Sequence, residues 1–512
     1  MPRIAAIDVG SNAIRMIVGE TAKSGQIETL ESVRLPVRLG EDAFASGRLR
    51  EATIRQTVDA FHFFRKTADA LEVSKIRSVA TSALREAANG DILKDRVLRA
   101  TGIEIEIISG EEEARLIHLA VIRSLKLEGK RAMLIDIGGG SVEVTLSENG
   151  RILSTESFNM GTVRLLNKLD SKKKGGLPFA PESQSFHVMV REYAEAARQR
   201  IDRDIGSRKI HVCIGTGGNV EEMGKLRQKL FNRENDKAIT LSELQELIEK
   251  LSKLSVPQRI RKYNLRPDRA DVILPAAIVL QIVAHEARAH QILIPKVGLK
   301  DGILIQLEQE LKTGHRQLDR RQVWQSALQA GEKYQYESAH ARLTAKFAGQ
   351  LFDQSVALHN LGNEEKLLLE VGALLHDIGH FINTIDHEKH GYYILQAHRL
   401  IGLNERQQEI TANLVRYPRK AFPSLDDENF KALAPKDRLT VLRLAALLRL
   451  VDGMDVSHKS RVQRLSLEEN KKGWVLTLHG NGDFMLEKWA LKKRKTLFED
   501  VYGVKLEIED KA

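Results

Sequence analysis

Residues 4–19 read IAAIDVGSNAIRMIVG, and residues 132–148 read AMLIDIGGGSVEVTLSE. In both segments an apolar run leads to an aspartate, Asp8 or Asp136, and then to a turn rich in Gly, Ser or Asn. Alternating residues that suit a second strand follow each turn. Each segment therefore predicts a β-hairpin whose turn tolerates positive φ and leaves backbone N–H groups free to face an anion. The repeat predicts two copies of one structural unit.

The elements expected around the two hairpins follow the same order in both copies. A third strand follows each hairpin, at residues 26–33 in the first copy and 151–158 in the second. Helical and strand patterns then alternate. The first copy continues with a helix over 53–71 and strands over 76–80 and 103–108; the second continues with strands over 210–214 and 292–297 and helices near 218–230, 242–253, 269–287 and from residue 300. Two α/β halves of the βββαβα type, facing each other, are therefore predicted over residues 1–125 and 126–312.

The size and composition of the chain restrict its class. Its 512 residues are too many for one hydrophobic core, so three or four domains are expected. The only cysteine, Cys213, leaves neither a disulfide framework nor a cysteine-based zinc cluster, which fits a reducing compartment. The chain does not begin with an apolar run of signal-peptide length, and no stretch approaches about 18 uninterrupted apolar residues. We therefore expect a cytoplasmic protein that does not enter a membrane.

The charge of the chain suggests a polyanionic partner. The formal net charge is +10 and the pI is near 9.4, although solubility explains such a charge equally well. Aromatic residues make up only 5%, and no basic segment is interleaved with the aromatic residues that stack on single-stranded nucleic acid. We therefore expect a simpler polyanion and no nucleic-acid partner.

Four turns of small residues fall at the ends of expected strands. They lie at residues 8–12, 80–82, 136–141 and 215–219, and two of them begin with an aspartate. A phosphate clamp has this composition, because backbone amides and helix N-termini bind the phosphate oxygens while a carboxylate holds the metal that neutralises them. None of the four turns matches a Walker A loop or the dinucleotide GxGxxG pattern, so P-loop and Rossmann folds are disfavoured.

A fifth segment, SGEEEARL at residues 109–116, predicts the start of a helix. Ser109 and Glu112 have the spacing of a capping box. Acidic residues in a first turn commonly do no more than complement the helix dipole, and this accounts for Glu112. Glu111 and Glu113 are not both needed for that purpose, so one of them is a candidate to orient an attacking water.

Six segments of the sequence carry a family resemblance: DVGSNAIRM, ATSALREA, ISGEEEARLI, LIDIGGGSVEV, FNMGTVRL and IGTGGNVEEM. Their order resembles that of the exopolyphosphatase/guanosine-pentaphosphate phosphohydrolase (Ppx/GppA) family, from residue 4 to about residue 310. The resemblance implies duplicated actin/Hsp70/hexokinase-like (ribonuclease H-like) domains, a Mg²⁺ requirement and hydrolysis of a terminal phosphoanhydride. It also implies that the glutamate before Ala114, which is Glu113, is catalytic and that Arg85 contacts phosphate.

The same resemblance implies a mechanism. Glu113 deprotonates a water for in-line attack on the terminal phosphorus, and Mg²⁺ is held by Asp136 and Glu143 with help from Asp8. The residues expected to bind the phosphate are Ser11, Asn12, Thr81, Ser82, Arg85, Gly138, Gly139, Gly140, Ser141, Gly217, Gly218 and Asn219. An aspartyl-phosphate route through Asp8 or Asp136 is a weaker alternative, because nucleophilic and metal-binding carboxylates look alike in sequence.

Residues 313–460 have helical patterns and the residue order of an HD-type metal site. The expected ligands of a second divalent transition metal are His340, His376, Asp377 and Asp452. Asp386, His387 and His390 are further donors nearby. Long exopolyphosphatases resemble this layout and often keep only an eroded HD core, so a second activity does not follow from it.

Residues 461–512 predict a small α+β C-terminal domain. Its expected elements are strands over 462–468, 474–479 and 504–509 and a basic helix over 484–498. Linkers are expected near 312–317 and 457–461. The basic runs Lys172–Lys174 and Lys492–Lys495 are candidates to guide polyphosphate, although such runs are usually solvated surface.

Exopolyphosphatase activity on inorganic polyphosphate is the function we expect first. A guanosine pentaphosphate (pppGpp) 5′-phosphohydrolase shares every motif, and no residue separates the two. A sugar kinase or ATP-driven chaperone of the same fold is disfavoured by the acidic SGEEEAR turn and the lack of a recognisable sugar site. A non-catalytic polyphosphate sensor with a signalling HD domain is a further alternative. A homodimer is expected because two-fold dimers are the commonest assembly.

Overall fold

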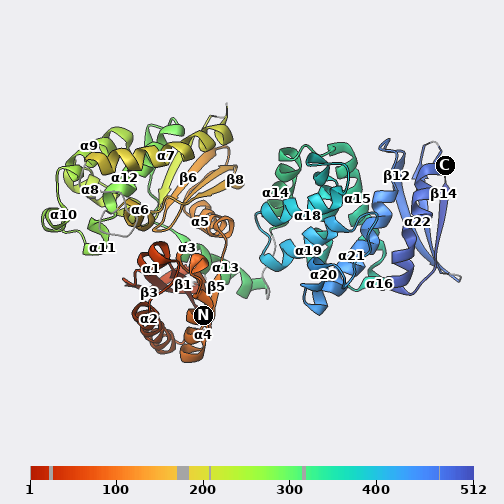
Figure 1. Cartoon of the computed structure of the whole chain (residues 1–512), viewed down its shortest axis with the longest axis horizontal. Coiled ribbons are helices and arrows are strands. Elements are labelled where there is room, and N and C mark those ends of the chain that lie inside the picture. Colours follow the sequence, from red (N-terminus) through yellow and green to blue (C-terminus); the bar gives the residue numbers. More distant parts are fainter. Residues whose placement is uncertain are drawn as a thin grey trace. The chain divides into compact units, whose positions relative to one another are not determined.

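The structure, a computed structural model, describes residues 2–21, 27–169, 184–206, 209–313, 319–471, 473–481 and 483–511. The chain forms two compact units, Met1–Gln317 and Leu318–Ala512 (Figure 1). The further division of each unit, at residues 125 and 460, stays a prediction. The basic run Lys172–Lys174 lies outside the described residues. Among the described helices, none is long and apolar enough to cross a membrane.

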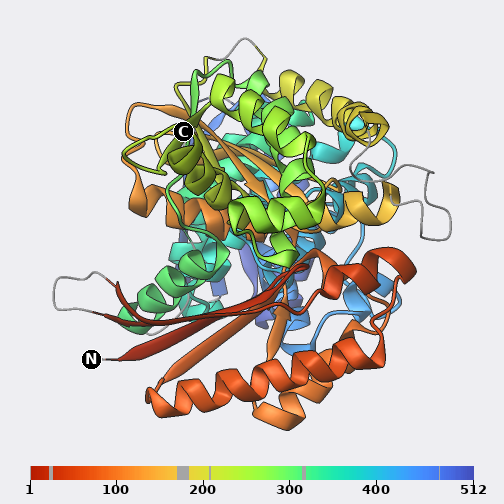
Figure 2. The ribbon, with the colours of Figure 1, turned by 90° about the vertical axis from the view of Figure 1, so that its left-hand side faces the viewer.

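The first unit begins with a five-stranded sheet in the order β3-β2-β1-β4-β5. Its strands are β1 (Arg3–Val9), β2 (Ile14–Thr21), β3 (Ile27–Leu35), β4 (Lys75–Ala80) and β5 (Ile105–Ile107). Strands β1, β2 and β3 are antiparallel, whereas β4 and β5 run parallel to β1. The predicted hairpin and third strand are therefore present. The predicted helix after them is α2 (Glu51–Ala70), which runs along one face of this sheet (Figure 2).

A second sheet repeats this arrangement and adds one strand. Its order is β10-β11-β9-β6-β7-β8. The strands are β6 (Arg131–Ile137), β7 (Val142–Glu148), β8 (Arg151–Phe158), β9 (Val212–Thr216), β10 (Ala238–Thr240) and β11 (Gln291–Leu293). The first five positions of the repeat, β8-β7-β6-β9-β11, match the order of the first sheet. The short edge strand β10 was not expected from the sequence.

Helices cover both faces of each sheet, because the alternating side chains of the central strands are apolar on both sides. Ala5, Ile7 and Val9 of β1 belong to the cluster with α2 and α4 (Gly90–Thr101), whereas Ile4 and Ala6 pack with α5 (Gly110–Ser124) and α13 (Leu299–Thr313). Ala132 and Leu134 of the second sheet join that same inner cluster. Helices α5 and α13 therefore pack against both sheets and fix the two halves of this unit around the strand ends.

The remaining helices of the first unit flank the two sheets (Figures 1 and 2). They are α1 (Leu39–Ser46), α3 (Ser82–Glu86), α6 (Thr162–Leu169), α7 (Gln184–Ile205), α8 (Gly218–Leu230), α9 (Leu241–Ser252), α10 (Val256–Tyr263), α11 (Pro267–Ala270) and α12 (Ile273–Glu286). The outer face of the second sheet packs on α7, α8, α9 and α12, and the residues of α12 are buried on nearly every side. A helix that is apolar all round is expected at the centre of a large layer.

The second unit is helical and ends in a small sheet, as its patterns predict. Its helices are α14 (Arg320–Lys333), α15 (Ser338–Gln354), α16 (Val356–His359), α17 (Asn363–Leu375), η1 (Ile378–Phe381), α18 (His387–Ala397), α19 (Glu405–Arg416), α20 (Glu428–Lys431), α21 (Pro435–Gly453) and α22 (Met485–Tyr502). Its strands are β12 (Val462–Asn470), β13 (Gly473–Gly480) and β14 (Leu506–Lys511), with β13 in the centre.

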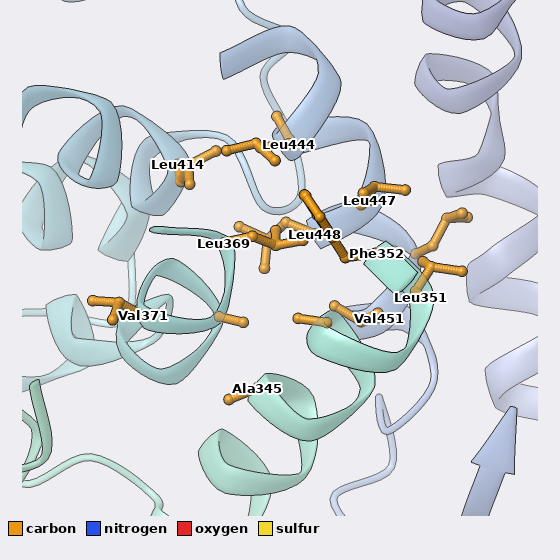
Figure 3. Packing of buried hydrophobic residues seen from close by; sticks show 14 of the residues in the cluster. Ala345, Leu351, Phe352, Leu369, Val371, Leu414, Leu444, Leu447, Leu448 and Val451 are labelled. Atoms are coloured by element: carbon orange, nitrogen blue, oxygen red, sulfur yellow. The ribbon is translucent and has the colours of Figure 1, made fainter. Parts of the chain in front are cut away.

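One apolar cluster holds this second unit together. Leu447, Leu448 and Val451 of α21 lie beside Leu351 and Phe352 of α15 (Figure 3). The cluster continues into the strands and α22, so the helices and the sheet share a single core. The buried faces of α15, α17 and α21 therefore position the histidines and aspartates that these helices carry at their ends.

Candidate active site

A cleft of about 100 Å³ opens where the small-residue turns of the first unit meet. It is lined by most of the residues predicted to act in this unit: Asp8, Ser11, Asn12, Thr81, Ser82, Glu113, Asp136, Gly138, Gly139, Gly140, Ser141, Gly217, Gly218 and Asn219. The other two, Arg85 and Glu143, are not among the residues that line it. Because both sheets end their central strands here, the duplication explains why the turns converge.

The two hairpin turns have the same backbone hydrogen bond. The N–H of Gly10 donates to the carbonyl of Ala13 at 3.2 Å, and the N–H of Gly138 donates to the carbonyl of Ser141 at 3.1 Å. Residues 11–12 and 139–140 lie inside the two turns. Among the described residues, their N–H groups donate to no backbone carbonyl of a turn, loop or helix cap. Such paired free N–H groups form a concave site for an anion.

The second turn packs so closely on the first half that it requires glycine. A Cβ added to Gly140 would lie 1.9 Å from Ser82 Oγ. Ser82 Oγ is itself 3.2 Å from Ser11 Oγ, so a hydrogen bond joins these two hydroxyls. Gly217, at the N-cap of α8, has φ +95°, and its Cβ would lie 2.6 Å from the Ile137 carbonyl oxygen. The N-terminus of α8, with its unpaired N–H groups and positive dipole end, therefore reaches the cleft.

Three buried carboxylates gather at this cleft. Glu113, Asp136 and Glu143 offer oxygen atoms within 4.8 Å of one another. Asp136 and Glu143 are partners across the β6–β7 hairpin. The Ser157 hydroxyl donates to Glu143 Oε1 at 2.8 Å, and the Thr216 hydroxyl donates to Asp136. The hairpin register holds Asp136 and Glu143 together, and the packing of α5 brings Glu113 to them.

The first turn of α5 shows why Glu113 differs from its two acidic neighbours. Ser109 caps the helix by accepting the N–H of Glu112 at 3.3 Å. The Glu112 carboxylate accepts from the Arg115 guanidinium at 2.6 Å, an ion pair within the same helix. Glu113 alone of the three is buried, and it faces the other two carboxylates.

Burial raises the pKa of all three carboxyls. For Asp136, burial raises the pKa to about 6 despite the hydrogen bond from Thr216. For Glu143, burial and then the charge of Asp136 raise the pKa to about 7. For Glu113, burial raises the pKa well above the usual carboxyl range, the charge of Glu143 adds to the rise, and the Arg85 guanidinium opposes it. Near neutral pH the cluster therefore holds protons or requires a cation.

A divalent cation fits this cluster. Glu113 Oε2 and Glu143 Oε2 are buried and, among the described residues, have no hydrogen-bond partner. Oxygen atoms of carboxylates are the ligands that Mg²⁺ uses in proteins. Asp8 lies near enough for its charge to raise the pKa of Asp136 and is itself 3.5 Å from the Arg15 guanidinium. The hairpin pair Asp136 and Glu143, with Asp8 beside it, would hold the ion.

We expect the stability of the ion-free protein to fall as the pH rises from about 4.5 to 7. A carboxyl whose folded pKa is raised contributes stability that is complete below its unfolded pKa near 4.5 and is lost as the pH rises through its folded pKa, about 7 for Glu143. The loss is on the order of 3 kcal/mol. Calorimetry at pH 5 and pH 8 should show most of it in the first unit's transition, and excess Mg²⁺ should restore stability mainly at pH 8. A Glu143→Gln variant with the same pH dependence would contradict this assignment.

Several cations at the cleft were not predicted from the sequence. Arg15, Arg269 and Lys300 line it. Arg269 is buried and donates to Asn219 Oδ1 at 2.6 Å. Burial, and then the charges of Arg15, Arg34 and other arginines, lower its pKa to about 10. An alignment of the two hairpins would have identified Arg15. In the first hairpin Arg15 pairs with Asp8, as Glu143 pairs with Asp136 in the second. Arg269 lies in a four-residue helix and carries no comparable sequence signal.

The contacts of Arg85 in this structure are with other residues of the chain. It lies outside the lining of the cleft, and its guanidinium donates to the carbonyl of Ile108. Its charge acts on the carboxyl of Glu113, whose pKa it lowers. A direct contact of Arg85 with phosphate therefore stays a prediction.

Comparison with known proteins identifies the family of this chain. Residues 16–311 match the Ppx/GppA phosphatase family, and residues 323–495 match Ppx/GppA phosphatase, domain III. The chain belongs to the Ppx/GppA phosphatase family. The resemblance that the six sequence segments indicated is confirmed. Members of this family are hydrolases that act on phosphoanhydride bonds, and the protein is such a hydrolase.

Curated relatives cover nearly the whole chain. A guanosine-5′-triphosphate,3′-diphosphate pyrophosphatase of Photobacterium profundum is 26% identical over 479 residues, 93% of this chain and 92% of the relative. A protein of the same name from Vibrio parahaemolyticus is 26% identical over 452 residues, 87% of each chain. The similarity therefore extends through both units.

Solved structures match about three fifths of the chain. An exopolyphosphatase from Cytophaga hutchinsonii has a TM-score of 0.56 at 23% identity and covers 60% of this chain and 98% of its own. A Ppx/GppA family member from Aquifex aeolicus has a TM-score of 0.52 at 24% identity and covers 61% and 99%. These likenesses show the fold, which is the mixed α/β, actin-like fold expected from the duplication.

The second unit brings together the four residues with HD-type order. His340 Nε2 is 3.2 Å from His376 Nε2, His376 Nε2 is 3.2 Å from Asp452 Oδ1, and Asp377 Oδ2 is 3.4 Å from His376 Nε2. Arg419 donates to both aspartates, at 3.0 Å to Asp452 Oδ2 and 3.0 Å to Asp377 Oδ2. Two sequence-distant cationic partners of Asp452, Arg419 and Arg494, thus lie in this cluster. A metal bound by all four residues stays a prediction, as does an HD-type domain.

Proposed function

We propose that the cleft of the first unit binds the terminal phosphate of a phosphate chain and that Glu113 activates the water that attacks it. The observation that supports this most strongly is the buried carboxylate cluster beside two turns of free backbone N–H groups. A carboxylate with a raised pKa is a good base once it is ionised, and water is the acceptor that phosphoanhydride hydrolysis requires.

Glu113 takes the proton from the water as the new oxygen–phosphorus bond forms. The bond from phosphorus to the bridging oxygen breaks, and that oxygen leaves with its electron pair on the shortened chain. The products are orthophosphate and a chain one phosphate shorter. Glu113 Oε2 suits this role because, within the described structure, it has no hydrogen-bond donor and lines the cleft.

The turns stabilise the charge that develops on the transferred phosphoryl group. The N–H groups at residues 11–12 and 139–140 and the N-terminus of α8 converge on the cleft from both halves. Mg²⁺ held by Asp136, Glu143 and Asp8 would neutralise phosphate oxygens in the same place. Ser157 and Thr216 orient two of these carboxylates through their hydroxyl groups.

For the substrate, we place guanosine pentaphosphate before inorganic polyphosphate, the reverse of the order suggested by the sequence. The curated relatives that cover 87–93% of this chain are named for the nucleotide. Polyphosphate remains a second candidate because Arg15, Arg269 and Lys300 line the cleft and suit a longer polyanion. Within the basic run Lys492–Lys495, Arg494 and Lys495 already pair with Asp452 and Glu499, which weakens the case that this run guides a chain.

Phosphate release from the two substrates will test this order. With the purified protein and Mg²⁺ we expect kcat/KM to be at least about tenfold higher for guanosine pentaphosphate than for long-chain polyphosphate. Raising the salt concentration should weaken polyphosphate turnover more steeply, because a linear polyanion releases more counterions on binding. The Glu113→Gln protein, purified in the same way, controls for contaminating phosphatases. A higher kcat/KM for polyphosphate would restore the exopolyphosphatase assignment.

A further inference from the structure

The second unit contains a cluster of metal-ligand type that shares only Asp377 with the HD-type quartet. Helix α17 ends at Leu375, and Asp377 directly precedes the short helix η1, which begins at Ile378. A turn then leads to α18, which starts at His387. A Cβ added to Gly379 would lie 1.8 Å from the carbonyl oxygen of His387, so η1 packs backbone against backbone on the first turn of α18.

This close packing places two histidine rings beside the Asp377 carboxylate. The rings of His380 and His387 are stacked, with centroids 4.0 Å apart. His387 Nε2 is 3.5 Å from Asp377 Oδ1, and His380 Nε2 is 3.7 Å from the same oxygen. The three ligand atoms all lie within 4.8 Å of one another.

Two buried atoms of this cluster lack a hydrogen-bond partner among the described residues. His387 is only 5% exposed, and its Nδ1 is 3.2 Å from the Thr384 carbonyl. Because a carbonyl only accepts, Nδ1 carries the proton and Nε2 presents its lone pair to Asp377 Oδ1. Among the described residues, neither His387 Nε2 nor Asp377 Oδ1 has a hydrogen-bond partner. Two buried acceptors that face each other are stabilised by a proton or a metal ion between them.

The distances suit one ion bound to all three residues. Bonds of about 2.0–2.2 Å to nitrogen and oxygen place the ligand atoms of a tetrahedral ion about 3.4 Å apart. The other nitrogen of His387 is held by Thr384, and Asp377 Oδ2 is held by Arg419 Nη2 at 3.0 Å. These contacts direct the remaining donor atoms at one point, as outer contacts do in metal sites. The His380 side chain is 37% exposed, so it can adjust, and solvent can complete the coordination.

The HD-type quartet is less suited to an ion, because its Asp452 carboxylate is already bound by two guanidinium groups. Asp452 Oδ2 accepts from Arg419 at 3.0 Å and from Arg494, and Asp452 Oδ1 accepts from Arg419 at 3.1 Å. An ion on Asp452 would have to lie against two guanidinium groups, which are fixed positive charges.

We propose that Asp377, His380 and His387 bind one divalent transition metal ion. Two imidazoles and one carboxylate suit Zn²⁺ or Fe²⁺, whereas Mg²⁺ prefers oxygen ligands alone. With three protein ligands and an exposed fourth position, the site is of the open kind that carries a bound water. The proposal is independent of the carboxylate cluster in the first unit and of the reaction proposed for it.

Cobalt binding to the full-length protein will test this site. Chelator-treated protein is titrated with Co²⁺ in excess Mg²⁺, which occupies the oxygen-only cluster, and visible absorption and elemental analysis report the bound ion. We expect one Co²⁺ per chain, with an affinity reduced at least 100-fold in His380→Ala and in His387→Asn. His390→Ala, on the same helix but outside the cluster, should bind as wild type does.

The variant His340→Asn separates this site from the HD-type quartet. We expect it to keep the Co²⁺ affinity of the wild type. Loss of binding in His340→Asn together with wild-type binding in His380→Ala would assign the ion to the quartet and overturn the proposal. Absence of Co²⁺ binding by the wild type in excess Mg²⁺ would overturn it as well. Since His380 lies at the surface, its variant should fold even if His387→Asn does not.

Discussion

Replacing Glu113 by glutamine should lower kcat by about three orders of magnitude while KM stays within about twofold. The amide keeps the size of the carboxylate but cannot accept the water's proton. The loss falls on kcat because the substrate's phosphates are bound by the turns and the cation, which this change leaves in place. Steady-state phosphate release, with substrate binding measured separately on the inactive variant, gives the two quantities.

Glu111→Gln provides the matched control for this prediction. It removes an acid from the same helical turn, yet Glu111 is outside the buried cluster. We expect its kcat to stay within about twofold of the wild type. If Glu111→Gln lost activity and Glu113→Gln kept it, the base would lie on the neighbouring face of α5 and the mechanism proposed above would be wrong.

The duplicated hairpins were predictable because local chemistry dictates them. An aspartate followed by glycine and small polar residues at the end of an apolar run specifies the turn in both copies, and strand alternation specifies what precedes and follows it. The register of a hairpin then places Asp136 opposite Glu143 without any information from the rest of the chain. These constraints act between residues that are close in the sequence, so they can be predicted from it.

Burial at the site was less predictable, because it depends on long-range packing. Nothing in the run Glu111–Glu112–Glu113 says which acid faces the second sheet; that depends on how α5 packs between the two sheets. Arg269 reaches Asn219, which lies 50 positions earlier in the sequence. A long flexible side chain in a four-residue helix leaves no periodic pattern from which such a contact can be inferred.

In the second unit, too, the sequence predicted some contacts of a residue cluster and missed others. The spacing of His340, His376 and Asp452 correctly suggested that these residues meet. It gave no indication that Arg419 and Arg494 would bond to the aspartate, because both come from other segments. Ligand order alone therefore identifies a cluster of donors, while the counter-charges that decide its occupancy require the folded structure.

The Glu143→Gln variant should raise the Mg²⁺ concentration needed for half-maximal activity by at least two orders of magnitude. Glu143 is buried, and its Oε2 is one of the two cluster oxygens without a partner among the described residues. An amide at this place weakens the hold on a divalent cation, so the developing phosphoryl charge loses its neutralising partner. Mg²⁺ titrations of initial rate measure the effect, and Glu148→Gln, on the same strand but paired with Arg131, is the control.

A second property of the same variant distinguishes loss of the ion's ligand from damage to the fold. The charge of Glu143 is, after burial, the largest influence raising the pKa of Glu113. Removing that charge lowers the pKa of Glu113, so the acidic limb of the pH–rate profile should move to lower pH when Mg²⁺ is saturating. A merely destabilised protein would lose rate without moving that limb. If the limb stays where it is and the Mg²⁺ requirement is unchanged, the ion is held elsewhere, with Asp8 as the next ligand to replace.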